Sequence, residues 1–279
     1  MVAGLALESL KALRQKRLEI EPVERAAGSK LKTVFLIRHG ESEWNVAQRQ
    51  FDVVGMFGQF DHGLTNRGAR QAEALRRRVR GANKTDAARL EFEGATRVYC
   101  SPLTRAVQTA LIALAGHRAL RDRGLTLADD LRELVYPVGG FDSIKRNPLD
   151  ASLRRARDTL GPRLAGQIER GRRYVDDEVA AAWYAETRRG AASRLARFVF
   201  TTLCGPEGDD DPVIVVGHSL FFMALVNNFA SEHLRVQDPV ARRLATSKLD
   251  NAAVARLTLN CSEPRYPVVA VEMCFTAVA

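Results

Sequence analysis

Short apolar runs alternate with amphipathic segments through most of the chain. The apolar runs predict five β-strands, at 33–40, 95–102, 210–219, 251–259 and 267–275. Apolar or small residues at helical spacing predict three helices, at 63–79, 103–116 and 220–234. Each of these helices follows one of the first three strands. Strands that alternate with helices are typical of an α/β fold, so we predict a three-layer α/β/α sandwich with a mostly parallel central sheet.

Two regions lie outside this alternation. Residues 136–190 look mainly helical and show no strand pattern, so we predict a helical insert that covers the active edge of the sheet. Residues 1–30 lack the apolar core and the cleavage site of a secretory signal, and we predict a short amphipathic helix followed by a linker. Residues 31–279 are then expected to form one domain that contains the insert.

The overall composition narrows the choice of partner. The chain of 279 residues has a net charge of +9 and a pI near 9.8, which favours anionic partners. Nucleic acid is disfavoured among these, because the chain shows no recognisable nucleic-acid-binding motif and no aromatic residues interleaved with the basic ones. No apolar run reaches the roughly 18–20 residues that a membrane span needs, so we expect a soluble protein without membrane association.

The four cysteines, Cys100, Cys204, Cys261 and Cys274, are scattered along the chain. No two of them lie at the spacing of a zinc site, and they are too few for a disulfide framework. We therefore expect reduced thiols, a cytoplasmic location and no structural metal.

Polar and cationic residues follow the three strands that are predicted to be parallel. Residues 38–39 follow the first strand, residues 101–105 the second and residues 218–219 the third. The carboxyl ends of parallel strands meet at one edge of a sheet, where ligands bind and helix N-termini point. Because these segments carry two arginines and two histidines, we expect them to converge on one anion-binding site.

Four motifs in these regions resemble those of one known family. "RHGESEWN" (38–45) is similar to the signature of the histidine phosphatase superfamily, the phosphoglycerate mutase-like proteins. "LTNRGARQAEAL" (64–75) resembles a helix of that family, and "SPLTRAVQTA" (101–110) resembles its S-x-x-x-R-A-x-x-T-A segment. "VVGHS" (215–219) lies where the second histidine of the family follows a late strand. The motifs occur in the order of the family across most of residues 33–226.

The resemblance implies roles for individual residues. His39 is expected to be the nucleophile that forms a phosphohistidine. Arg38 and Arg105 are expected to bind the phosphate through their guanidinium groups, and His218 to donate a further hydrogen bond. Further substrate contacts are expected from three neighbouring residues, Gly40, Asn45 and Ser219. No metal and no cofactor is expected, because the cationic side chains themselves bind the phosphate.

The expected proton donor is Glu133, in "LRELVYP" (131–137), at the position where the family carries its acidic residue. It would protonate the leaving alcohol and then accept a proton from the attacking water. One alternative is a surface glutamate that pairs with Arg132, and another is Asp142 as the acid in its place. His62 is expected to be a solvated loop residue, although a role at the edge of the substrate site stays open.

These residues predict a metal-independent phosphatase that hydrolyses a phosphomonoester, either a phosphorylated small molecule or a phosphoprotein. A mutase that transfers the phosphoryl group is the first alternative. Mutases of the superfamily carry "ERHYG" around the acidic residue, whereas this chain has "ELVYPVGG" at 133–140, so hydrolysis is favoured. A catalytically inactive module that binds a phosphorylated ligand is the second alternative. The presence of Arg38, His39, Arg105 and His218 disfavours it.

Overall fold

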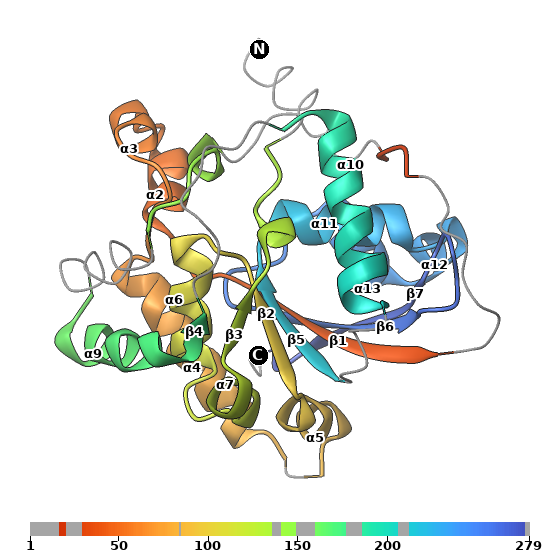
Figure 1. Cartoon of the computed structure of the whole chain (residues 1–279), viewed down its shortest axis with the longest axis horizontal. Helices are drawn as coiled ribbons and strands as arrows, with labels where there is room; N and C mark the ends of the chain where they lie inside the picture. The colour runs from red at the N-terminus through yellow and green to blue at the C-terminus, as the bar shows by residue number, and fades with distance from the viewer. Residues whose placement is uncertain are drawn as a thin grey trace.

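The centre of the molecule is a seven-stranded sheet with the strand order β4-β3-β2-β5-β1-β6-β7 (Figure 1). The computed structural model describes residues 17–20, 30–83, 85–135, 141–148, 160–176, 186–205 and 212–276. The strands are β1 (Leu31–Arg38), β2 (Arg97–Cys100), β3 (Leu125–Leu127), β4 (Val175–Asp176), β5 (Val213–Gly217), β6 (Val254–Asn260) and β7 (Val268–Cys274). The first five strands pair in parallel, and β6 and β7 pair antiparallel at one edge. The prediction of a mostly parallel sheet is confirmed.

Helices cover both faces of this sheet and make the predicted three layers (Figure 1). They are α2 (Glu43–Gln50), α3 (Val53–Phe57), α4 (Asn66–Gly81), α5 (Ala87–Gly94), α6 (Thr104–Ala113), α7 (Arg118–Arg123), α9 (Pro162–Gly171), α10 (Arg188–Arg197), the π-helix η4 (Phe198–Leu203), α11 (Ser219–Phe229), α12 (Glu232–Gln237) and α13 (Pro239–Thr246). Short 3₁₀ turns are η1 (Asp129–Leu131), η2 (Phe141–Ser143) and η3 (Arg172–Tyr174). Among the described residues, no helix is long and apolar enough to cross a bilayer.

Two hydrophobic cores lie on opposite faces of the sheet, and alternate residues of β1 supply both. Phe35 and Ile37 point into the core that α4, α6 and α9 complete, whereas Val34 and Leu36 point into the core beneath α10, η4 and α11. This alternation is the period of two that a β-strand imposes on its side chains. The side chains of β1 are apolar on both faces of the sheet because both faces are buried.

The predicted insert at 136–190 differs from the expectation in its described parts. Within it, α9 packs against α6, where Gln167 donates from Nε2 to the carbonyl oxygens of Leu111 and Ile112 at 3.1 and 3.0 Å. The strand β4 extends the sheet by pairing with β3, although the sequence shows no strand pattern there. A two-residue strand leaves no alternation for a sequence pattern to detect. Residues 136–140, 149–159 and 177–185 lie outside the described residues.

The predicted helix at 220–234 is interrupted. The helix α11 ends at Phe229, and Ala230 then forms an isolated bridge with Val268. Ser231 caps the new helix α12 by accepting a hydrogen bond from the Leu234 amide. The serine cap was the available sequence signal for this break.

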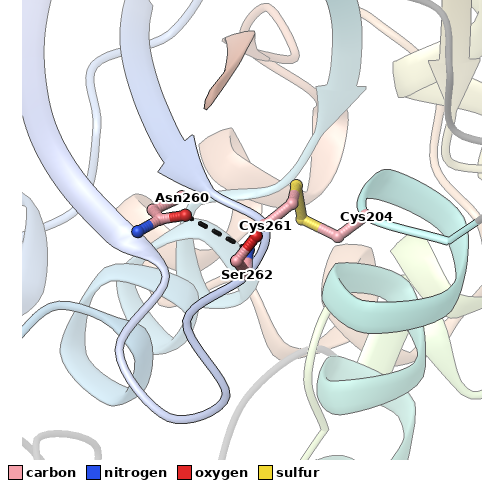
Figure 2. Close-up of a disulfide and its surroundings, with 4 residues drawn as sticks. All are labelled: Cys204, Asn260, Cys261 and Ser262. Carbon is pink, nitrogen blue, oxygen red and sulfur yellow. Dashed lines mark hydrogen bonds between the residues drawn. A yellow bond between two sulfur atoms is a disulfide. The ribbon is translucent and has the colours of Figure 1, made fainter. Parts of the chain in front are cut away.

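The expectation of four reduced cysteines was wrong. Cys204 follows the end of η4 and Cys261 follows the end of β6, and their sulfurs form a disulfide (Figure 2). Cys100 and Cys274 are free and buried. The partners of the disulfide lie 57 positions apart, so nothing in their spacing indicated that the two ends meet in space.

Candidate active site

Three neighbouring strand ends carry the residues that the sequence grouped together. Strand β5 lies between β1 and β2, and backbone hydrogen bonds continue beyond the last paired residues of both strand pairs. The His39 amide donates to the Gly217 carbonyl at 3.0 Å, and the Ser101 amide donates to the Val216 carbonyl at 2.9 Å. The ring of His39 consequently lies beside that of His218, with 5.1 Å between their centroids. The expected convergence of these segments is present.

His39 has one ring nitrogen fixed by the backbone. Its Nδ1 lies 2.6 Å from the Gly40 carbonyl oxygen, and a carbonyl oxygen can only accept. We therefore assign the proton to Nδ1, which leaves a lone pair on Nε2. The imidazole is 3% exposed and lines a cleft. Burial lowers the pKa of His39 well below its ordinary value, and the charges of Arg105 and Arg38 lower it further.

Two buried guanidinium groups line the same cleft. Arg38 donates from Nη1 to the Leu249 carbonyl at 2.5 Å, while its Nε is buried without a partner in the part of the chain that the structure describes. Arg105 lies in the first turn of α6 and pairs through Nη1 with Asp142. Its Nη2 donates to Ser143 Oγ at 3.0 Å. Both cations are thus oriented by contacts with the protein.

His218 and Ser219 begin α11 at the end of β5. Nε2 of His218 lies 2.7 Å from Ser101 Oγ, whereas its Nδ1 is buried and has no partner within the described ranges. Burial lowers the pKa of His218 well below its ordinary value, and the nearby charge of Arg105 adds to this effect. An unpartnered buried nitrogen is uncommon in proteins. Ser219 lines the cleft beside it.

Glu133 also lines the cleft and is 7% exposed. Its carboxylate accepts hydrogen bonds from the amides of Leu220 and Phe221, at 3.2 and 2.9 Å, in the first turn of α11. The alternative of a surface glutamate does not fit, because Glu133 is buried and backbone amides bind its carboxylate. These contacts fix the position of the Glu133 side chain at the start of α11.

Asp142, the alternative candidate for the proton donor, is bound to two other side chains. Its two carboxylate oxygens pair with Arg105 and with Nδ1 of His62, and it is fully buried. Burial raises the pKa of Asp142, but the charge of Arg105 and the hydrogen bond from His62 outweigh this and hold it below the ordinary value. Asp142 thus orients Arg105.

His62 and its neighbour Asp61 are residues whose place the sequence did not reveal. His62 is 1% exposed, so the expectation of a solvated loop residue was wrong. Asp61 accepts hydrogen bonds from the Thr104 amide and hydroxyl, at 2.7 and 2.8 Å, and so caps the helix that carries Arg105. Burial raises the pKa of Asp61 to about 6. A buried carboxylate and imidazole side by side in a loop leave no periodic signal.

Gly40 and Asn45 take different positions around the cleft. The Gly40 amide donates to Thr109 Oγ1 at 3.0 Å and is therefore used within the protein. A Cβ atom at Gly40 would lie 2.4 Å from the Gly68 carbonyl oxygen, so this glycine permits close packing against α4. Asn45 lines the cleft and also caps α2, where its Oδ1 accepts from the Ser42 amide.

Residues 34–269 match the family model of the histidine phosphatase superfamily (branch 1). The chain belongs to this superfamily. The matched range contains every residue that lines the candidate cleft, from Arg38 to Lys248. The resemblance of the four sequence motifs is thereby confirmed.

Curated relatives match only parts of this histidine phosphatase superfamily member. A probable phosphoglycerate mutase GpmB from Proteus mirabilis (strain HI4320) is 42% identical over 79 residues, which is 28% of this chain and 29% of the relative. The probable phosphoglycerate mutase GpmB from Yersinia pestis (strain Pestoides F) is 35% identical over 120 residues, which is 42% of this chain and 43% of the relative. Each match spans less than half the length of the relative.

Solved structures also align with the chain. A phosphoglycerate mutase from Bacillus anthracis (strain Sterne) aligns with a TM-score of 0.47 at 17% identity, over 88% of this chain and 94% of its own. A mycobacterial glucosyl-3-phosphoglycerate phosphatase aligns with a TM-score of 0.44 at 21% identity, over 88% of this chain and 98% of its own. Mutases and phosphatases both occur among these names, so the names do not choose between the two activities.

Proposed function

We propose that this protein is a metal-independent phosphatase that hydrolyses a phosphomonoester through a phosphohistidine on His39. The proposal rests on the position of the His39 imidazole. Its Nδ1 proton is held by the Gly40 carbonyl, and its ring lines the same cleft as Arg38, Arg105 and Glu133. A neutral imidazole between two fixed cations can act as a nucleophile towards a bound phosphate.

In the first half-reaction, Arg38 and Arg105 bind the phosphoryl oxygens through charge-assisted hydrogen bonds. Nε2 of His39 attacks phosphorus, and the bond from phosphorus to the ester oxygen breaks. The departing oxygen takes a proton from Glu133 and leaves as an alcohol. His218 contributes a hydrogen bond from Nδ1, the buried nitrogen that lacks a protein partner among the described residues.

In the second half-reaction, water attacks the phosphohistidine. The bond from phosphorus to nitrogen breaks, and its electron pair returns to Nε2 of His39. Glu133 takes a proton from the water, so both side chains regain their starting states when inorganic phosphate leaves. The guanidinium groups offset the charge on the phosphoryl oxygens throughout, which is the role that a metal ion fills in other phosphoryl-transfer enzymes.

The substrate class that we propose is a phosphorylated small molecule, with a phosphoprotein as the alternative. The cleft wall includes apolar and polar side chains beyond the phosphate-binding group, namely Trp44, Asn45, Gln48, Leu220 and Lys248. These residues would contact the alcohol part of the ester. A panel of phosphorylated metabolites and phosphopeptides, assayed for released phosphate, would distinguish the two classes.

The proposal is tested with 4-nitrophenyl phosphate, with and without a chelator. Hydrolysis should not depend on the chelator, and His39→Ala should lower kcat/KM by at least about 10³-fold because the nucleophile is lost. His233→Ala, at an exposed histidine of α12, is the matched control and should leave the rate unchanged. Retained activity in His39→Ala would overturn the proposal, and an inert wild-type protein would favour a binding module.

A mutase remains the second candidate, because curated relatives over part of the chain are named as probable phosphoglycerate mutases. With 3-phosphoglycerate as substrate, a phosphatase releases inorganic phosphate, whereas a mutase yields 2-phosphoglycerate without releasing phosphate. Phosphorus NMR of the reaction mixture measures both products at once. Isomerisation that outpaces phosphate release would replace the phosphatase proposal.

A further inference from the structure

The expected proton donor lies on a segment without regular structure. Glu133 follows the 3₁₀ turn η1, and residues 132–135 form neither helix nor strand. Its carboxylate is oriented by amides of α11 and by the Leu134 amide at 3.0 Å. A catalytic group on an irregular segment stays within reach of its target only when other contacts fix the backbone.

Arg194 of α10 binds this backbone and does not line the cleft. Its Nη1 donates to the carbonyl oxygens of Asp130 and Arg132, at 2.7 and 2.6 Å. Its Nη2 lies 3.5 Å from the carbonyl oxygen of Glu133 itself. Arg194 is 4% exposed, so these bonds are shielded from water. One guanidinium group thus contacts the backbone of the proton donor and of two residues that precede it.

A buried ion pair orients Arg194 in turn. Glu186 accepts from Nε of Arg194 at 3.0 Å, also pairs with its Nη2, and the two side chains are each 5% exposed. The second oxygen of Glu186 accepts from the Val135 amide at 2.7 Å. The guanidinium also lies 5.7 Å from the ring centroid of Phe221, whose amide binds Glu133. Arg194 and Glu186 therefore hold the segment both before and after Glu133.

We propose that Arg194, supported by Glu186, is a positioning residue for proton transfer, which keeps the Glu133 carboxyl on the cleft wall. This inference rests on the proposed phosphatase function and on Glu133 as the proton donor. Arg194 does not need to touch the substrate, because it acts through the backbone of the donor. Burying an ion pair is costly, and well-packed apolar side chains often replace such pairs without loss of stability. A role in geometry is therefore the more specific explanation of this pair.

The test separates proton donation from all other steps by the choice of leaving group. 2,4-Dinitrophenyl phosphate releases a stable anion and needs no proton, whereas glycerol 3-phosphate releases an alkoxide unless it is protonated. Arg194→Met should lower kcat/KM for glycerol 3-phosphate by about 10–100-fold, by analogy with the loss of side chains that orient metal ligands. For 2,4-dinitrophenyl phosphate the change should stay within about twofold, because phosphate binding and attack by His39 are untouched.

Arg197→Met is the matched control. Arg197 lies one turn further along α10 and pairs with the Asp130 side chain. Its own side chain is 58% exposed, and among the described residues it makes no hydrogen bond to the carbonyls around Glu133. This variant should change neither rate. Arg194→Lys keeps the charge but not the planar fork, and should restore part of the activity with glycerol 3-phosphate.

Loss of the fold has to be separated from loss of position, because Arg194→Met leaves the Glu186 carboxylate buried without its cation. The double variant Arg194→Met/Glu186→Gln removes both charges and should show the same dependence on leaving group. Glu133→Gln is the reference for a lost proton donor. Circular dichroism and thermal unfolding establish which variants are folded before rates are compared.

Each outcome decides a different statement. An equal loss with both substrates in folded Arg194 variants, or no loss with either, overturns the inference. If Glu133→Gln shows the split between substrates and the Arg194 variants do not, the inference alone fails and the proposed function stands. If Glu133→Gln shows no split, Glu133 is not the donor and the inference falls with that assignment. If His39→Ala stays active, the phosphohistidine route itself fails.

Discussion

At the scale of single residues, Asp142 controls how Arg105 presents its charge to the cleft. The carboxylate holds Nη1 of Arg105 and is itself held by His62. A guanidinium that is hydrogen-bonded along one edge keeps its other donors in a fixed direction. Less conformational entropy is therefore lost when an anion such as phosphate binds. Under the proposed function, the buried Asp142 contributes to phosphate binding through Arg105 and without contacting the substrate.

Asp142→Asn should lower kcat/KM by about 10–100-fold, and equally for 2,4-dinitrophenyl phosphate and glycerol 3-phosphate, because it acts through Arg105 in both reactions. The exposed pair of Arg121 and Asp122 supplies the control, since Asp122→Asn should have no effect. A loss confined to glycerol 3-phosphate would instead make Asp142 the proton donor and exclude Glu133.

His39 in the cleft and the neighbouring His218 should remain neutral in mildly acidic solution. Burial and nearby arginines lower the pKa of His39 and of His218 well below 6.5, and a lowered pKa means that a proton binds only at lower pH. In NMR titrations, with signals assigned through His39→Ala and His218→Ala, neither imidazole should titrate at 6.5 or above. The attacking form of His39 should therefore persist as the pH falls below this value. A His39 midpoint at or above 6.5 would contradict the prediction.

Sequence alone predicted the residues of the cleft that follow strand ends, but not those that support them. Arg38, His39 and His218 stand next to apolar runs whose ends are visible in the pattern. The contact between Asp142 and His62 joins two loops that are far apart in sequence, and no periodicity connects them. The same holds for Arg194, which looks like one cation among many on a basic helix.

At the scale of elements, a contact between two glycines determines how closely the loop after β1 approaches α4. A Cβ atom at Gly68 would lie 2.0 Å from the Glu41 carbonyl oxygen and 2.7 Å from the Glu41 amide nitrogen. Neither position tolerates a side chain, because the atoms opposite belong to the backbone. The loop that carries His39 is thus packed directly onto the start of the helix.

Gly68→Ala should lower the free energy of unfolding by about 1–3 kcal/mol, since the backbone has to move apart. Gly81→Ala, at the end of the same helix, is the control, because a Cβ atom there has nothing within 4 Å. That substitution should be neutral or stabilise by up to about 1 kcal/mol. Urea unfolding of both variants measures the difference, and equal stabilities would refute the packing argument.

The elements that sequence predicted are those with a long, uniform pattern. The strands β1, β5 and β6 were found because each carries an apolar run or an alternation, and the helices α4 and α6 because each carries several consecutive turns. The two-residue strand β4 and the five-residue helix α3 are too short to show a period. The break between α11 and α12 was missed because apolar residues continue across it at helical spacing, and tertiary pairing of Ala230 with Val268 ends the first helix.

At the scale of the whole molecule, the disulfide joins the helical layer, at the end of η4, to the sheet, at the end of strand β6. Cys204 belongs to the segment that continues from α10 through η4, and Cys261 follows β6 (Figure 2). A covalent bond across this boundary limits the separation of the two layers in the unfolded chain. It also removes the argument from reduced thiols that favoured a cytoplasmic location.

Closing a loop of 57 positions should stabilise the folded protein by about 4 kcal/mol in the chain-entropy account. Reduction by dithiothreitol should therefore lower the midpoint of thermal unfolding. The Cys204→Ser variant should match the reduced protein and should not respond further to the reductant. Mass spectrometry after alkylation should find only Cys100 and Cys274 as thiols in the oxidised protein, and four alkylated cysteines would contradict the bond.

The central position of β5 also determines when the cleft can first exist during translation. Strands β1 and β2 leave the ribosome early, yet they do not pair with each other, because β5 lies between them. A nascent polypeptide that stops before β5 lacks the strand that pairs with both β1 and β2, and it lacks His218, which lies beside both His39 and Ser101. Under the proposed function, competence to bind phosphate is thus a late event of biosynthesis, and truncated translation products should carry none of it.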